Sequence, residues 1–373
     1  MDPYGPIARR FPLVARFRPA CLPLPERVRA LTELASRATQ QTDPGLASTV
    51  FNQAALLASD IGLPGLARSM CHRHAQAYLR TCPLPAMSAI RGLEPLINLA
   101  RLQIRAGHTD DARQRLLDLH EAVGTGSPAT FEGITMPANL TRTNEDRRQV
   151  HAWLWRALLA DGTRTLTTTG RWPEALAHVK QHRGVGSRML DGRQVAVVSA
   201  LTVGDTERAA DLLSNTVLGE PWEQIITACL MVLCRRSIGQ PVDGHIADLT
   251  NAFLGHEARP GLIVFDIRLG LTVLDAVSPA QHGEVGQLVQ ELVRRTAEAR
   301  DGYAAREVLT HSLAATLATA SQAQDCSYLI RTCALGSGAL PDGCYADLLA
   351  AMDAAGAVLT RTVTKTSGSR QPG

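Results

Sequence analysis

Polar side chains that could bind or transform a ligand are densest in residues 139–194. Six cations follow Asp161 in this stretch, which also holds three of the four tryptophans of the chain. Guanidinium groups bind anions through charge and paired hydrogen bonds, so cations that converge here predict an anionic ligand. The residues that we expect to line such a site are Trp155, Asp161, Arg164, Arg171, His178, Arg188, Asp191 and Arg193. The alternative is a set of solvated arginines paired with Asp161, Glu174 and Asp191.

Two groups of metal-capable side chains occur, but we expect no metal at either. Glu174, His178 and His182 lie at positions i, i+4 and i+8, which places them on one face of an expected helix. A metal site would still need a fourth ligand from elsewhere in the chain. Cys71, His72 and His74 also lie close together, yet adjacent residues of a helix point in different directions. We therefore expect neither a metal nor a cofactor.

The sequence contains none of the short motifs that identify common catalytic sites. A phosphate-binding loop ending in lysine and a His-Glu-x-x-His pair are both absent, and Gly184 and Gly186 lack the third glycine of a dinucleotide site. Whether the chain is an enzyme stays open. One hypothesis is a non-catalytic interaction or regulatory protein. The other is an enzyme or accessory subunit of actinobacterial specialised metabolism, with a pocket lined by residues 161–193.

The composition limits the location and the partners of the chain. It has 373 residues, a net charge of +3 and eight cysteines, with no Cys-x-x-Cys pair. It also lacks an apolar run of about 18 residues and a secretory signal pattern, so we expect a cytoplasmic protein that does not enter membranes. A near-neutral charge and 4% aromatic residues argue against nucleic acid. The partners that we expect are a protein or peptide and a small anionic ligand, and a homodimer stays open.

The elements that position these residues are indicated by a repeated pattern in the sequence. A glycine stands five residues before an alanine four times, in Gly62–Ala67, Gly107–Ala112, Gly170–Ala175 and Gly204–Ala209. The pattern predicts helical hairpins, because glycine can end the first helix in a left-handed conformation. The small alanine then allows the second helix to approach the first closely. The residue four positions later packs in the same seam.

This pattern resembles the tetratricopeptide repeat, in which helical hairpins recur about every 34 residues. The last two glycines, Gly170 and Gly204, are 34 residues apart, and the resemblance covers roughly residues 44–220. The aromatic residue expected early in each first helix is mostly missing, so the peptide-binding positions of the family cannot be carried over. The resemblance implies an all-α fold, a right-handed α-solenoid of about seven stacked hairpins with a concave binding groove. Similar repeats are typical of actinobacterial regulators.

The pattern also suggests a division of the chain. We expect an N-terminal extension in 1–25, tetratricopeptide-like repeats in 26–220 with a loop insertion at 124–143, C-terminal helical repeats in 221–360 and a disordered tail in 361–373. Thr143 with Asp146 predicts a capped helix start. The helices expected after Pro221 span 221–236, 243–254, 261–276, 280–299, 302–320, 321–334 and 342–359.

Overall fold

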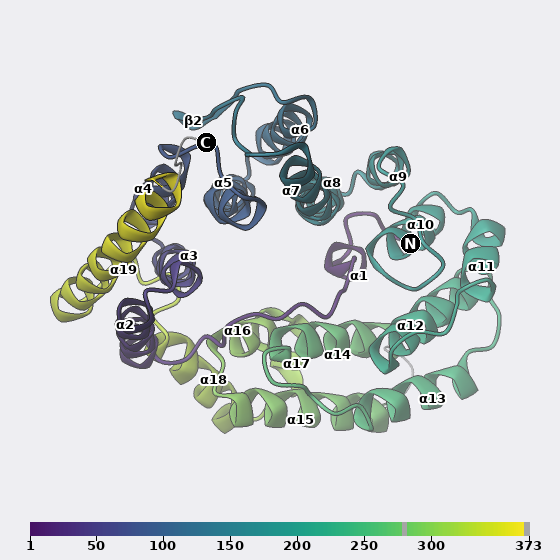
Figure 1. Ribbon diagram of the computed structural model, residues 1–373. Helices are drawn as coiled ribbons and strands as arrows, with labels where there is room; N and C mark the ends of the chain where they lie inside the picture. The colour runs from purple at the N-terminus through teal and green to yellow at the C-terminus, as the bar shows by residue number, and fades with distance from the viewer. Residues whose placement is uncertain (278–281, 369–373) are drawn as a thin grey trace. The chain divides into compact units, whose positions relative to one another are not determined.

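The computed structural model describes residues 1–277 and 282–368, and its regular structure is almost entirely α-helical (Figure 1). The predicted all-α class is therefore confirmed. The chain forms two compact units. Unit 1 combines Met1–Leu22 with Thr163–Cys333, and unit 2 combines Pro23–Gly162 with the described residues from Ala334 onward. The chain changes unit at 162–163 and not at 220–221, where we had expected a boundary.

Unit 2 is built from helices of both ends of the chain. Its elements are α2 (Leu24–Gln41), α3 (Pro44–Ile61), α4 (Pro64–Leu79), α5 (Ala86–Arg105), α6 (Thr109–Thr125), β1 (Ala129–Phe131), β2 (Ile134–Met136), α7 (Asn144–Ala157), the π-helical turn η1 (Leu158–Gly162) and α19 (Asp342–Gly368). The last helix, α19, packs against α2 and α3 (Figure 1). Leu348, Met352 and Leu359 of α19 are buried in the same apolar core as Leu31 and Phe51.

Unit 1 has a second apolar core, formed mainly by the helices that follow η1. Its elements are α1 (Pro6–Arg10), α8 (Thr163–Thr167), α9 (Trp172–Gln181), α10 (Asp191–Thr202), α11 (Thr206–Ser214), α12 (Pro221–Ser237), α13 (Asp243–Leu254), α14 (Ile263–Val277), α15 (His282–Ala299), α16 (Gly302–Thr310), α17 (Ser312–Leu317) and α18 (Ala320–Thr332). Trp172 and Phe253 are among its largest fully buried side chains.

The four predicted glycine turns are confirmed. Gly62, Gly107, Gly170 and Gly204 have φ angles of 95°, 87°, 72° and 80°, in the left-handed region that favours glycine. Each lies between paired helices: α3 and α4, α5 and α6, α8 and α9, or α10 and α11. The four alanines of the pattern, Ala67, Ala112, Ala175 and Ala209, are fully buried. The two helices of each pair can therefore pack closely, because the small alanine side chain leaves room between them.

The N-terminal residues are not an extension, because they are built into unit 1. Gln194 is fully buried, and its amide both donates to and accepts from the backbone of Leu13 at 2.7 Å. The carbonyl of Cys21 accepts a hydrogen bond from the Gly302 amide at 2.8 Å. Arg10 pairs with Asp275, which also accepts from His311 at 3.0 Å. Backbone and side-chain groups of the later helices and loops of unit 1 therefore supply hydrogen-bond partners to this segment.

The expected loop at 124–143 contains a short hairpin. Ala129, Thr130 and Phe131 pair with Met136, Thr135 and Ile134, and the turn places Glu132 and Gly133 at φ angles of 44° and 79°. Phe131 and Ile134 are buried in the apolar core of unit 2, and this packing holds the hairpin in place. The expected tail at 361–373 also differs, because α19 continues to Gly368. Residues 369–373 lie outside the described part of the chain.

The helices predicted after Pro221 are present among the described residues, with one division; the first two residues of the predicted helix 280–299 lie outside the described part of the chain, and α15 is described from His282 to Ala299. α13 spans Asp243–Leu254 as expected, whereas the stretch 302–320 is split into α16 and α17 at His311. His311 has an extended backbone, and its Nδ1 accepts from the Ala314 amide at 3.2 Å, so it caps α17. The predicted capping box of Thr143 and Asp146 is confirmed. Among the described residues, no helix is long and apolar enough to span a membrane.

The glycine turns generate a paired test within unit 2. Gly107→Ala should lower the free energy of unfolding by about 1 kcal/mol, because alanine resists the left-handed conformation while the space around its Cβ is open. Gly65→Ala is the matched control, since Gly65 lies within α4 at ordinary φ with equally open surroundings. Urea denaturation should show the loss for Gly107→Ala alone. Equal stability of the two variants would contradict the role of the turn.

Candidate functional site

The eight residues predicted to line a groove are divided between the two units. Trp155 and Asp161 belong to unit 2. Arg164, Arg171, His178, Arg188, Asp191 and Arg193 belong to unit 1. In unit 2, buried Asp161 accepts from Arg101 at 2.8 and 3.0 Å. Trp153 and Trp155 are both half-buried, and Trp153 packs against the core.

In unit 1, the predicted residues serve local contacts. Arg171 donates to Glu174 at 2.7 Å, Arg188 pairs with Glu223 and Asp191 pairs with Arg16. Arg164 is exposed on α8. Buried Arg193 donates to Gly186, Leu212 and Thr216, all within unit 1. These pairings fit the alternative interpretation of arginines held by nearby carboxylates and carbonyls, so they do not support the predicted anionic groove.

Glu174, His178 and His182 do not converge on a common point. Glu174 is more than half exposed and pairs with Arg171, whereas His178 is buried. The rings of His178 and His182 meet edge to face, with their centroids 4.8 Å apart. Burial lowers the pKa of His182. The i, i+4 spacing thus brings the two imidazoles together but leaves the carboxylate in solvent.

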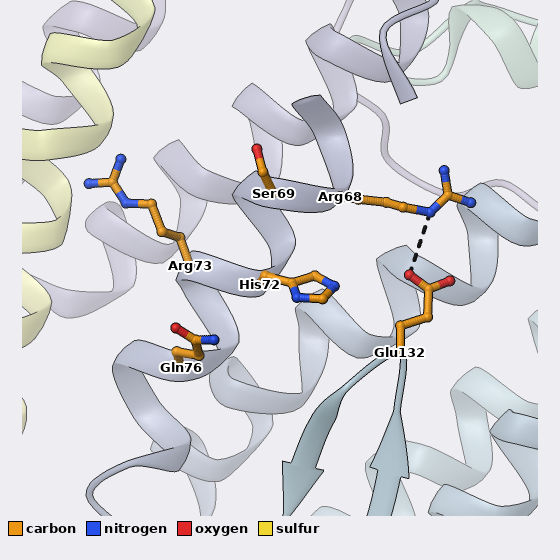
Figure 2. Close-up of a pocket in the computed structure, with 6 residues that line it drawn as sticks. All are labelled: Arg68, Ser69, His72, Arg73, Gln76 and Glu132. Carbon is orange, nitrogen blue, oxygen red and sulfur yellow. Dashed lines mark ion pairs between the residues drawn. The ribbon is translucent and has the colours of Figure 1, made fainter. Parts of the chain in front are cut away.

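A pocket of about 520 Å³ lies on the exposed face of α4, in unit 2 (Figure 2). Its lining side chains are Arg68, Ser69, His72, Arg73, Gln76 and Glu132. Five of these come from α4, where spacings of four residues align Arg68 with His72 and Ser69 with Arg73. The opposite face of α4 is buried in the core, through Ala67, Met70 and Tyr78 among others. Because the apolar face of α4 is buried, its polar residues lie on the side of the helix that faces solvent.

The β1–β2 turn supplies the carboxylate of the pocket. Glu132 accepts a hydrogen bond from Gln103 at 2.6 Å, and Arg68 Nε lies 3.5 Å from a carboxylate oxygen of Glu132. Figure 2 marks this ion pair between Arg68 and Glu132. Arg73 reaches Asp353 of α19 at 2.7 Å and lies over the Phe51 ring. The lining holds two arginines and one glutamate, and Asp353, which pairs with Arg73, lies beside it. Guanidinium groups in exposed ion pairs can exchange their carboxylate partners for a ligand anion, and the hydroxyl, amide and imidazole side chains of the lining are additional hydrogen-bonding partners.

The reactive groups beneath the pocket are held in their neutral forms. Burial raises the pKa of the Cys71 thiol to about 12, and the charge of Glu132 adds to the shift. Burial lowers the pKa of His74 to about 3, and its ring stacks on Phe51 with centroids 5.2 Å apart. Among the residues that the structure describes, neither ring nitrogen of His74 has a hydrogen-bond partner. Cys71 therefore offers no thiolate and His74 no accessible base, while only His72 faces the pocket.

The sequence contained a partial signal for this site. The stretch RSMCHRHAQ at 68–76 places polar residues four apart, and of its metal-capable group Cys71, His72 and His74, only His72 lines the pocket while the other two are buried. Arg68, Ser69, Arg73 and Gln76 were not singled out. Glu132 could not be found from sequence, because it reaches the pocket from a hairpin 60 residues beyond His72 in the chain.

Comparisons with known proteins assign no family to this geometry. No family model, curated protein or solved structure matches the chain. The resemblance to tetratricopeptide repeats accordingly stays a prediction.

The buried imidazole of His74 predicts a pH dependence of stability. The unfolded chain binds a proton at this position below about pH 6.5, whereas the folded chain does so only near pH 3, so stability is complete above pH 6.5 and falls as the pH decreases. Between pH 7 and pH 5, His74 should lower the free energy of unfolding of the wild type by about 2 kcal/mol, and His74→Phe should abolish this part of the decrease. Denaturant titrations at both pH values measure it. Exposed His108→Gln is the control and should leave the loss unchanged.

Proposed function

We propose that this chain is a non-catalytic binding protein with a regulatory role, and that its α4 pocket binds an anionic group of a peptide or small effector. The observation that carries the proposal is that a guanidinium group stands at each side of the pocket, Arg68 toward Glu132 and Arg73 toward α19 (Figure 2). Arginine binds carboxylates and phosphates through two parallel hydrogen bonds. Ser69 and Gln76 add neutral hydrogen-bonding groups beside them.

The existing ion pairs leave both arginines able to engage a ligand. Asp353, the partner of Arg73, has a side chain that is 70% exposed, and such solvated pairs contribute little free energy. Arg68 approaches Glu132 at 3.5 Å, longer than a hydrogen bond. Glu132 would repel a bare anion but would accept from a neighbouring donor. We therefore favour a ligand that carries an N–H or O–H group next to its anionic group.

Binding without chemistry is favoured because the groups under the pocket are inert. The Cys71 thiol stays protonated at neutral pH, since burial raises its pKa to about 12. His74 is buried and unable to exchange protons with a ligand. A cytoplasmic location and a peptide or protein partner are part of the same proposal.

We also propose that the hairpins belong to a right-handed α-solenoid of about seven stacked hairpins, as the tetratricopeptide resemblance implies. Support comes from the left-handed glycines and the buried alanines at the four predicted positions. One contact departs from a linear repeat array, in which each repeat meets only its neighbours: α19 packs on α2 and α3.

The test is calorimetric titration with inorganic phosphate and with citrate, an anion that carries its own hydroxyl donor. We expect the wild-type chain to bind citrate more tightly than phosphate. The double variant Arg68→Gln/Arg73→Gln should bind citrate at least about tenfold more weakly, a difference of about 1.4 kcal/mol. Glu132→Gln should improve phosphate binding by removing the repulsion.

The matched control is Arg37→Gln, which makes the same charge change at an exposed position of α2. It should bind both anions as the wild type does. If the double variant and Arg37→Gln have equal affinities, or if the wild type binds neither anion at millimolar concentration, the proposed function is wrong.

A further inference from the structure

Two loops of unit 1 present apolar side chains to solvent. Residues 182–190 connect α9 with α10, and residues 215–220 connect α11 with α12. Val185, Leu190, Val217 and Leu218 are exposed, and Leu218 keeps 79% of its surface accessible. We call these four residues the loop patch. Apolar side chains exposed on adjoining loops are candidates for covering by a second molecule.

The two loops are joined by backbone and side-chain hydrogen bonds. The amide of Val217 donates to the carbonyl of Ser187 at 2.9 Å. Arg193 lies behind the loops and donates to Gly186 at 3.0 Å, to Leu212 at 2.6 Å and to Thr216 at 2.8 Å. Arg193 is only 7% exposed. A buried guanidinium with three partners holds the loops in one conformation, because moving either loop would leave a buried charge unsatisfied.

Close packing fixes the ends of both loops. A Cβ at Gly192 would lie 2.2 Å from the carbonyl oxygen of Gly184, so only glycine fits at the start of α10. Glu223 is 1% exposed, pairs with Arg188 and accepts from the Glu220 amide at 3.1 Å. Leu218 is thus displayed by an ordered loop. A partner that binds the loop patch would lose little affinity to loop ordering.

The charges around the loop patch are unbalanced. Each nearby carboxylate is already paired with an arginine: Asp191 with Arg16, Glu220 with Arg259 and Glu223 with Arg188. Lys180 and Arg183, at the end of α9 and the start of the first loop, are exposed. Neither has an ion-pair partner among the residues that the structure describes. The loop patch therefore combines apolar side chains with two unneutralised cations.

We propose that the loop patch is a docking site for a protein segment that carries apolar side chains next to carboxylates, an acidic amphipathic segment. Its apolar side chains would cover Val217 and Leu218, and its carboxylates would pair with Lys180 and Arg183. Charge complementarity of this kind steers association and sets partner choice. This inference concerns unit 1 and goes beyond the ligand proposed for the α4 pocket.

The probe is a fluorescein-labelled 18-residue helical peptide with leucine at positions i, i+3, i+4 and i+7 and glutamate on the rest of its surface. We expect micromolar binding by fluorescence anisotropy in low salt. Leu218→Ser should weaken binding at least tenfold, and Lys180→Glu/Arg183→Glu should do the same. The same peptide with lysine in place of glutamate should bind at least tenfold more weakly to the wild type.

The matched control is Val203→Ser, because Val203 is another exposed apolar residue of unit 1, with 64% of its surface accessible, at the opposite, C-terminal end of α10. It should bind the glutamate peptide like the wild type. The variant Arg68→Gln/Arg73→Gln should also keep full peptide binding, which separates this test from that of the α4 pocket. Circular dichroism checks that each variant folds.

Three results would overturn the proposal. The first is equal peptide affinity of Leu218→Ser and Val203→Ser. The second is equal affinity of the wild type for the glutamate and lysine peptides. The third is a concentration-dependent dimer in sedimentation that Leu218→Ser abolishes, because the occupant would then be a second copy of this chain.

Discussion

The close approach of paired helices at a glycine turn is the constraint on which the rest of the structure depends. At Gly62 the chain adopts a left-handed conformation, reverses, and starts α4 with Pro64. Ala67 is then buried against the preceding helix, and Cys71 follows in the same seam. Because this seam fixes which face of α4 is buried, it also fixes which face carries Arg68, His72 and Arg73. The α4 pocket is a consequence of the hairpin geometry.

Each unit is closed by a segment from a distant part of the sequence. In unit 2, the chain before α19 caps α3: the amides of Gly336 and Gly338 donate to the carbonyls of Asp60 and Ile61, both at 2.8 Å. The last carbonyls of a helix need such partners, because they have none within the helix. In unit 1 the closing segment is the N-terminus, which Gln194 holds at Leu13. In both units a segment that is distant in sequence therefore contributes to the packing of the unit.

Arginine has two roles in this chain. Arg101, Arg188 and Arg193 bind carboxylates or carbonyls of their own unit, and the planar fork of the guanidinium suits several acceptors at once. Arg68 and Arg73 form ion pairs at the surface, and Arg183 is exposed. The first group shapes the loops and turns, and the second group determines what the surface can bind. Because only two lysines occur among the 38 basic residues, residue type alone cannot separate these roles.

The sequence by itself determined the local structure: the helices, the glycine turns, the capping box at Thr143 and the burial of the four alanines. These features depend on backbone conformation and on periodicities of a few residues, which are visible in a single chain. The sequence did not determine which arginines are free, since the partners of Arg188 and Asp161 lie 35 and 60 residues away. Nor did it predict that residues 1–22 belong with 163–333. Only tertiary packing decides such pairings, because it brings together side chains whose separation in sequence carries no period or motif.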